Sequence, residues 1–334
     1  MKIRFTSIIF TVIITILLFN LTACSHGKPN NNSSGKDTVS VNIASLKGPT
    51  SIGLVKLYSD SDSGLTVNKY NYNIYGTADE ISTGLIKGEI DIAAIPCNLA
   101  SVLYNKTQGE ILIAAVNTLG VLYIVENGNT ISDIKDLKGQ TLYSTGQGTT
   151  PEYTLRYILS KNGIDPDRDI NIVYCSEASE VVSAISSGNA TIGMLPQPYV
   201  TVAQNKIEGL RIALDITEEW EQADKDSTVV TGVTVVQKEF AQNNPKAVQD
   251  FINEYRNSAE FANAETDACA LLLEKYDIFK AEIAKKAIPQ CNVVLYTGEE
   301  MNSKVLAYLS VLYNANPSSI GGKLPDNSIF YTVQ

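Results

Sequence analysis

Two stretches of the chain, residues 81–106 and 181–206, repeat one pattern of hydrophobic and polar positions. Each begins with an amphipathic helical pattern that ends at a glycine, and continues with a short apolar run, 90–95 or 190–195. A proline then opens another helix, a position where its missing N–H costs nothing. The alternation of helix, strand and helix predicts βαβ units and largely parallel sheets. Aligned without a gap, the stretches share Gly88/Gly188, Ile92/Ile192, Pro96/Pro196, Val102/Val202, Asn105/Asn205 and Lys106/Lys206.

The separation of the two stretches excludes a solenoid, whose period is about 20–50 residues. We interpret them as one unit that occurs in two similar, Rossmann-like α/β lobes. Chance is the alternative, because Gly-x-hydrophobic-x-Pro is a common pattern. Open α/β sheets bind ligands at the carboxyl ends of their strands. The duplication therefore predicts a ligand cleft between two lobes.

Apolar or alternating runs predict the other elements. Further strands are expected at 39–45, 67–75, 111–116, 141–144, 170–174 and 210–215. Two crossover strands, 122–125 and 232–236, are expected to carry the chain to the second lobe and back. Helices are expected at 52–57, 133–139, 151–162, 240–261, 268–276, 281–288 and 299–313, with the C-terminal ones packed on lobe one. The polar stretch 217–231 is expected to be a loop.

The N-terminus has the order of a secretory signal. A positive start with Lys2 and Arg4 precedes an apolar run, 5–19, that is too short for a convincing membrane span. Leu21–Cys24 resembles the bacterial lipobox, in which the cysteine is lipidated; an incidental cysteine is the alternative. Residues 25–37 are polar and non-periodic, which is typical of a flexible tether. The domains expected are a lipoprotein signal peptide at 1–23, lipidated Cys24 with a tether at 24–37, lobe one at 38–123 plus 232–334, and lobe two at 124–231.

Charge and histidine content exclude several functions. Without Lys2 and Arg4, 24 basic and 36 acidic residues remain, a net charge of −12, which argues against nucleic acid as a partner. The single histidine, His26, lies in the tether, so the folded part has no imidazole for Ser-His-Asp or Cys-His catalysis or for metal binding. We expect no catalytic residue, cofactor or metal.

Four cysteines follow Cys24: Cys97, Cys175, Cys269 and Cys291. Outside the cell they allow three complete disulfide pairings. Cys269 with Cys291 is the favoured pair, and free buried thiols are an equal alternative.

Several of these features together resemble a known family. The lipobox, the strand followed by Gly48-Pro49-Thr50, and the duplicated unit are similar to type II periplasmic-binding-protein-like solute receptors. The motifs at 136–149 and 215–245 resemble the branch that binds nitrate, sulfonate, taurine or thiamine-pyrimidine precursors. The resemblance covers about residues 38–315. It implies a monomeric, lipid-anchored, extracytoplasmic receptor that closes two lobes on a small molecule and delivers it to an ABC permease and ATPase.

By this resemblance the ligand site lies on loops that face the cleft. The candidate ligand-binding residues are Lys47, Gly48, Pro49, Thr50, Tyr75, Gly76, Thr77, Pro96, Cys97, Asn98, Gln147, Gly148, Thr149, Thr150, Glu152, Gln197, Pro198, Tyr199 and Trp220. Each also has a structural interpretation; Thr149 and Glu152, for example, fit a capping box for their own helix.

The candidate loops contain Lys47 but no arginine. Tyr75, Tyr199 and Trp220 are able to stack on a planar ring, and Glu152 to accept from a ring amino group. We therefore favour an aromatic or heterocyclic solute, such as a pyrimidine precursor, over sulfonate, taurine or nitrate. An enzyme on the same fold and a sensor or adhesion module are the alternatives from other classes, because fold does not fix function.

Overall fold

The computed structural model describes residues 38–332. The predicted signal peptide, Cys24 and the tether lie outside the described residues. Between 38 and 332, no helix is long and apolar enough to cross a membrane.

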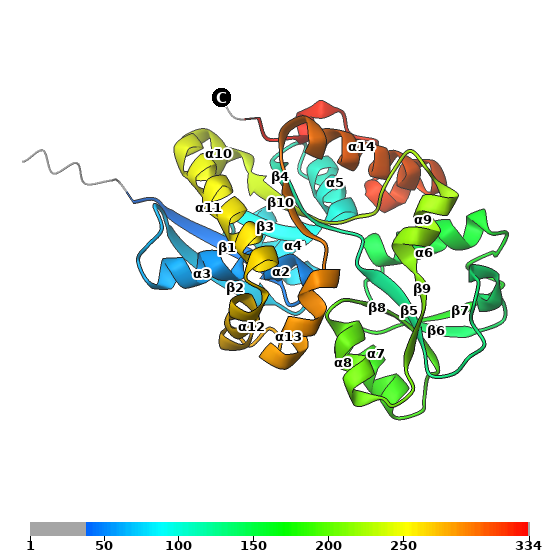
Figure 1. The fold of residues 1–334 in the computed structure, drawn as a ribbon. Helices are drawn as coiled ribbons and strands as arrows, with labels where there is room; N and C mark the ends of the chain where they lie inside the picture. The colour runs from blue at the N-terminus through cyan, green and yellow to red at the C-terminus, as the bar shows by residue number, and fades with distance from the viewer. Residues whose placement is uncertain (1–37, 333–334) are drawn as a thin grey trace, which may run out of the picture. The chain divides into compact units, whose positions relative to one another are not determined.

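Two sheets form the framework (Figure 1). The strands of the first are β1 (Ser40–Leu46), β2 (Lys69–Tyr75), β3 (Ile92–Pro96), β4 (Ile111–Leu119), β10 (Val230–Gln237) and β11 (Val293–Tyr296), in the order β11-β4-β10-β3-β1-β2. The strands of the second are β5 (Leu122–Glu126), β6 (Thr141–Ser144), β7 (Asn171–Tyr174), β8 (Ile192–Pro196) and β9 (Arg211–Asp215), in the order β7-β6-β8-β5-β9.

The two sheets have the same core topology. In the first, β1 runs parallel to β2 and β3, and β10 is antiparallel to β3 and β4. In the second, β6 runs parallel to β7 and β8, and β5 is antiparallel to β8 and β9. β5 follows β4 in the chain but joins the second sheet, and β10 follows β9 but joins the first. The predicted α/β fold with two crossover strands is confirmed.

Both copies of the duplicated unit form helix, strand and helix. The first consists of α4 (Ala78–Lys87), β3 and α5 (Cys97–Lys106), and the second of α7 (Ala178–Ser186), β8 and α8 (Tyr199–Lys206). Gly88 and Gly188, which follow the first helix of each copy, have φ angles of 72° and 77°. Glycine adopts this left-handed conformation without steric cost, which explains why both copies carry it.

Helices cover the sheets. In chain order they are α2 (Pro49–Ile52), α3 (Val55–Asp62), α6 (Thr150–Lys161), α9 (Ile216–Ala223), α10 (Lys238–Asn243), α11 (Pro245–Ala264), α12 (Thr266–Lys275), α13 (Ala281–Ala287) and α14 (Gly298–Ala315), with short 3₁₀ turns at Ile134–Leu137, Ile288–Gln290, Pro317–Ile320 and Asn327–Ile329. In α14, Met301, Val305, Tyr308 and Leu312 are buried at helical spacing. Tyr308 also contacts α6, because its hydroxyl lies 2.7 Å from the hydroxyl of Thr154. The C-terminal segment therefore contacts helices next to both sheets.

Two local predictions were wrong, and one strand was not predicted. Residues 217–231 begin with helix α9, because the Asp215 side chain accepts from Thr217 N and because Ile216 and Trp220 share a buried face. The predicted helix at 52–57 is divided into α2 and α3 near Gly53. The strand β11 lay in a stretch that had no assignment.

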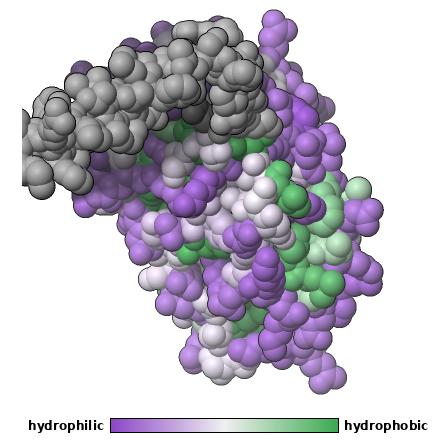
Figure 2. Space-filling view, turned by 90° about the vertical axis from the view of Figure 1, so that its left-hand side faces the viewer, coloured by the Kyte–Doolittle hydropathy of each residue, from purple (hydrophilic) through white to green (hydrophobic). Residues whose placement is uncertain are grey.

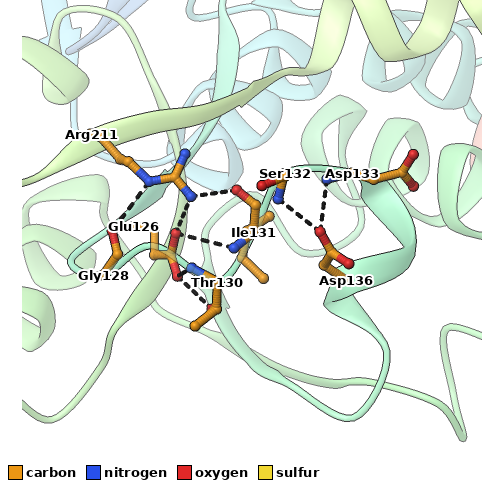
Figure 3. Close-up of polar contacts among 8 residues, drawn as sticks. All are labelled: Glu126, Gly128, Thr130, Ile131, Ser132, Asp133, Asp136 and Arg211. Carbon is orange, nitrogen blue, oxygen red and sulfur yellow. Dashed lines mark hydrogen bonds and ion pairs between the residues drawn. The ribbon is translucent and has the colours of Figure 1, made fainter.

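A buried carboxylate connects β5 to β9 (Figure 3). Glu126 is 2% exposed and accepts hydrogen bonds from Thr130 N at 2.7 Å, Thr130 Oγ1 at 2.6 Å and Ile131 N at 3.3 Å. Its other partner is Arg211, whose guanidinium lies 2.5 Å away. Burial raises the pKa of Glu126, but these hydrogen bonds outweigh burial and lower the pKa below its usual value.

The four cysteines among the described residues are free thiols. Cys269 and Cys291 are both buried, and the Cys291 thiol donates to the carbonyl of Ala287. The structure therefore has the free-thiol alternative and not the Cys269–Cys291 pair.

Candidate functional site

A cavity of about 500 Å³ lies where the carboxyl ends of the parallel strands of both sheets meet. The first sheet contributes the segments after β1 and β2 and the end of β3, and the second contributes those after β6 and β7 and the end of β8. Leu122 of β5 and Thr231 of β10 add the crossover strands. This is the place at which open α/β sheets bind ligands, and the volume suits a small organic molecule.

The duplication extends to the cavity wall. Seven pairs of residues that line it stand one hundred positions apart: Leu46/Gly146, Lys47/Gln147, Pro49/Thr149, Gly76/Ser176, Thr77/Glu177, Ala78/Ala178 and Pro96/Pro196. Corresponding loops of the two halves therefore face one ligand space.

Ten of the candidate residues line this cavity: Lys47, Gly48, Pro49, Thr50, Gly76, Thr77, Pro96, Gln147, Thr149 and Tyr199. The structure does not place Tyr75, Cys97, Asn98, Gly148, Thr150, Glu152, Gln197, Pro198 and Trp220 among the lining residues. The first group stays in the proposed site, and most members of the second group make other contacts inside the protein.

Trp220 and Cys97 are core residues. The Trp220 side chain is fully buried, with ring centroids 4.7 Å from Tyr157 and 5.1 Å from Tyr308. Its Nε1 donates to Ser227 Oγ at 3.0 Å. Cys97 is also fully buried, and burial raises the pKa of its thiol. Neither side chain is available to a ligand in the cavity.

Two buried amides join the parts of the protein that flank the two sheets. Asn98 on α5 donates to the carbonyl of Gly148 at 3.2 Å and accepts from Thr150 Oγ1 at 3.2 Å. Gln197, just after β8, donates to Gln290 Oε1 at 2.8 Å. These side chains hold backbone segments in place and are already paired.

Thr149 and Glu152 do not form the predicted capping box. The Thr149 hydroxyl donates to the carbonyl of Gly146 at 2.7 Å, and Glu152 accepts from Gly148 N at 2.6 Å. Arg156, one turn further along α6, lies 3.7 Å from Glu152. Glu152 therefore fixes the loop that contributes Gln147 to the cavity and does not point to a ligand.

Sequence reasoning missed Glu177, which follows β7. A Cβ atom on Gly76 would lie 2.9 Å from Glu177 Oε1, so this carboxylate faces the opposite loop and needs a glycine there. The offset of one hundred residues from Thr77, already a candidate, would have identified it. Other lining residues absent from the candidates are Leu46, Ala78, Asp79, Leu122, Thr145, Gly146, Pro151, Tyr174, Cys175, Ser176, Ala178, Pro196 and Thr231.

The charged residues that line the cavity are Lys47, Asp79 and Glu177. Lys47 pairs with exposed Asp277 at 3.6 Å, whereas neither carboxylate forms an ion pair within residues 38–332. Burial, and then the negative charge of Glu177, raise the pKa of Tyr199. In the described part of the chain, no group of three or more His, Cys, Asp or Glu residues is placed to hold a metal ion.

The family model described as "ABC transporter, phosphonate, periplasmic substrate-binding protein" matches residues 66–264. This range is more than half of the chain and includes most of the cavity. The chain belongs to this family.

Similar proteins and structures agree with this assignment. The protein YtlA of Bacillus subtilis (strain 168) is 26% identical over 133 residues, which is 38% of this chain and 39% of YtlA. The crystal structure of an ABC transporter from Parabacteroides distasonis is 26% identical, with a TM-score of 0.72 over 89% of this chain and 100% of that chain. The periplasmic aliphatic sulphonate binding protein SsuA from Escherichia coli is 15% identical, with a TM-score of 0.69 over 88% of this chain and 92% of that chain.

The surface of this substrate-binding protein is mainly hydrophilic on the face shown in Figure 2. Hydrophilic residues predominate among the coloured atoms there, with smaller hydrophobic areas between them. The tyrosines that line the cavity, Tyr174 and Tyr199, are in contrast partly buried. They provide the aromatic surface that sequence reasoning had assigned to Tyr75, Tyr199 and Trp220.

Proposed function

We propose that the protein is an extracytoplasmic receptor that binds a small solute and delivers it to the permease and ATPase of an ABC importer. The observation that carries this proposal is that loops from both duplicated halves line one shared cavity. β5 and β10 cross between the sheets, so a hinge at these strands would close the cavity on its ligand. Membership in a family of substrate-binding proteins supports the same function.

The N-terminal residues support a location for this receptor outside the cytoplasm. Removal of residues 1–23 would leave Cys24 as a lipid anchor, and 24–37 as a tether to lobe one (38–123 plus 232–334) and lobe two (124–231). We therefore propose that the receptor is lipid-anchored on the outer side of the cell membrane, and that it acts as a monomer.

For the ligand, we favour a planar ring that carries an amino group. Tyr174 and Tyr199 supply aromatic surface, and Glu177 and Asp79 supply carboxylates without a cationic side-chain partner among residues 38–332. An amino group that meets Glu177 would form a charge-assisted hydrogen bond, which is about twice as strong as a neutral one.

An oxyanion is the second candidate within the same class. Lys47 lines the cavity, and the helices α4 and α7 begin at the lining residues Ala78 and Ala178. Backbone N–H groups at a helix N-terminus favour negative charge. The family description names phosphonate, and the E. coli relative is described as an aliphatic sulphonate binding protein. The absence of an ion-pair partner for Asp79 and Glu177 within residues 38–332 is the observation that favours the amino-bearing ring over the oxyanion.

Binding without catalysis fits the cavity better than an enzyme. The sequence after the tether contains no histidine, and the Cys97 thiol is buried with a raised pKa. Glu152, the other candidate acid or base, is committed to Gly148 N. A sensor that presents a closed form to another protein would use the same cavity. ATP hydrolysis by the importer that is stimulated by the ligand-loaded receptor, and not by the ligand-free receptor, would distinguish transport from sensing.

Thermal-shift screening of the protein purified after expression of the full-length chain tests the proposal. The panel contains hydroxymethylpyrimidine, thiamine, aromatic amines, aminoethylphosphonate, taurine, alkanesulfonates and nitrate. A ligand at about 100 times its Kd adds roughly 2.7 kcal/mol to the free energy of unfolding. A shift by an amino-bearing ring supports the favoured ligand, and a shift only by phosphonate, sulfonate or nitrate supports the oxyanion. No shift by any compound would contradict the receptor proposal.

Glu177→Gln is expected to weaken binding of an amino-bearing ligand at least about tenfold, because a hydrogen bond to a charged group contributes about 1.5–3 kcal/mol. The control is Glu208→Gln, which changes an exposed glutamate outside the cavity and is expected to leave Kd unchanged. Isothermal titration calorimetry measures both values. Equal Kd values for the two variants would show that Glu177 does not bind the ligand.

A further inference from the structure

Three hydroxyl groups in the cavity wall have no hydrogen-bond partner among the described residues. Within residues 38–332, the buried side-chain polar atoms without a partner are Thr50 Oγ1, Thr231 Oγ1, Tyr174 OH and Asn302 Oδ1. Thr50, Thr231 and Tyr174 line the cavity. Buried polar groups in proteins are nearly always paired, and an unpaired one lowers stability. At a binding site, a bound ligand would provide the missing hydrogen-bond partner and offset this loss of stability.

Thr50 and Thr231 lie on two adjoining elements, α2 and the crossover strand β10, which together form one patch of the cavity wall. Thr50 is 5% exposed and lies in α2, which follows β1, and Thr231 on β10 is 8% exposed. A Cβ on the next residue, Gly232, would lie 2.6 Å from Thr50 Cγ2. The glycine therefore allows the helical turn that carries Thr50 to approach β10.

Other polar side chains on the neighbouring elements are paired inside the protein. On the adjoining strands, Asn117 donates to Thr234 Oγ1 at 3.0 Å, and Thr118 donates to Asn117 at 2.9 Å. Thr150 stands one hundred positions after Thr50, and its hydroxyl donates to Asn98 Oδ1 at 3.2 Å. This threonine hydroxyl of the other half is thus paired inside the protein.

Tyr174 does not belong to this patch. Its hydroxyl lies near Glu152 and Arg156: burial, and then Glu152, raise the pKa of Tyr174, and Arg156 lowers it. Because these two side chains are available to its hydroxyl inside the protein, Tyr174 does not require a ligand as partner.

We propose that Thr50 and Thr231 are specificity-determining residues whose hydroxyls donate to an acceptor atom of the ligand. This inference rests on the proposed function. With Glu177 on the other half of the wall, it defines the ligand class more closely: a small solute with an oxygen or ring-nitrogen acceptor at one end and a donor nitrogen at the other. A solute without the acceptor would leave both hydroxyls unpaired and would be rejected.

Valine replaces threonine with nearly the same shape and removes only the hydroxyl. In the ligand-free protein, Thr50→Val and Thr231→Val are expected to have a Tm equal to or higher than the wild type, because each removes an unpaired buried group. Thr150→Val is the matched control and is expected to lower Tm, because it removes a paired hydroxyl and leaves Asn98 Oδ1 without this donor. A lower Tm in Thr50→Val or Thr231→Val would show a partner inside the protein and overturn the proposal.

The second arm measures the Kd of each panel compound that shifts the wild type, using the protein from the full-length chain. Thr50→Val and Thr231→Val are each expected to raise Kd at least about tenfold. A Kd within twofold of the wild type in either variant would overturn the role of that residue while the receptor function stands. If no compound binds the wild type, the proposed function fails, and the inference is withdrawn with it.

Discussion

Trp220→Ala is expected to lower the free energy of unfolding by about 3–5 kcal/mol, which is usual for removal of a large buried aromatic side chain. Trp220 is fully buried between Tyr157 of α6 and Tyr308 of α14. Alanine leaves a cavity between these helices and removes the hydrogen bond to Ser227. Because Trp220 is the only tryptophan, circular dichroism during urea unfolding is the suitable measurement.

Two variants serve as references for this result. Leu271→Ala changes an apolar side chain that is 63% exposed and is expected to alter stability by less than about 0.5 kcal/mol. Trp220→Phe is expected to fold with a smaller loss than alanine, since most of the aromatic packing remains. Equal stability of Trp220→Ala and the wild type would contradict the burial of this residue.

Glu126→Ala is expected to destabilise the protein by about 3 kcal/mol, at the lower end for a broken buried ion pair because Arg211 is partly exposed. The substitution leaves the N–H groups of Thr130 and Ile131 without their acceptor (Figure 3). The control Lys285→Ala removes an exposed pair with Asp267 and is expected to cost less than about 1 kcal/mol. Similar losses in the two variants would contradict this role of Glu126.

The same carboxylate predicts a dependence on pH. The pKa of Glu126 is lower in the folded protein than the usual value of about 4.3. Its contribution to stability is therefore fully present above the unfolded-state pKa and is lost as the pH falls through the folded-state pKa. The stability difference between wild type and Glu126→Gln should be smaller at about pH 3 than at pH 7. A difference independent of pH would contradict the lowered pKa.

The sequence predicted the fold because its two halves carry the same periodic signal. The apolar runs before Pro96 and Pro196 and the glycines at 88 and 188 have local physical causes, so they mark βαβ units in any context. Strand pairing then follows from the preference of sequential parallel strands for neighbouring positions. The duplication, with the loops after β1 and β6, also predicted about half of the candidate site.

The other candidates could not be assigned from local pattern because their partners are distant in sequence. Asn98 is paired with Gly148 and Thr150, and Trp220 packs against Tyr308. The stretch 217–231 is mostly polar, so its composition did not indicate the buried face of Ile216 and Trp220 that stabilises α9. Glu177 was missed because its role depends on a loop of the other half, although the repeat contained the information needed to find it.

The central claim is that the cavity between the two sheets binds one small solute. Calorimetric titration of the wild-type protein, with the compound that gives the largest thermal shift, tests it most directly. We predict saturable binding of one molecule per chain, weakened at least about tenfold by Glu177→Gln when the compound carries an amino group and by Thr50→Val when it carries an acceptor. Absence of saturable binding, or binding of such a compound that both variants leave unchanged, would contradict the account.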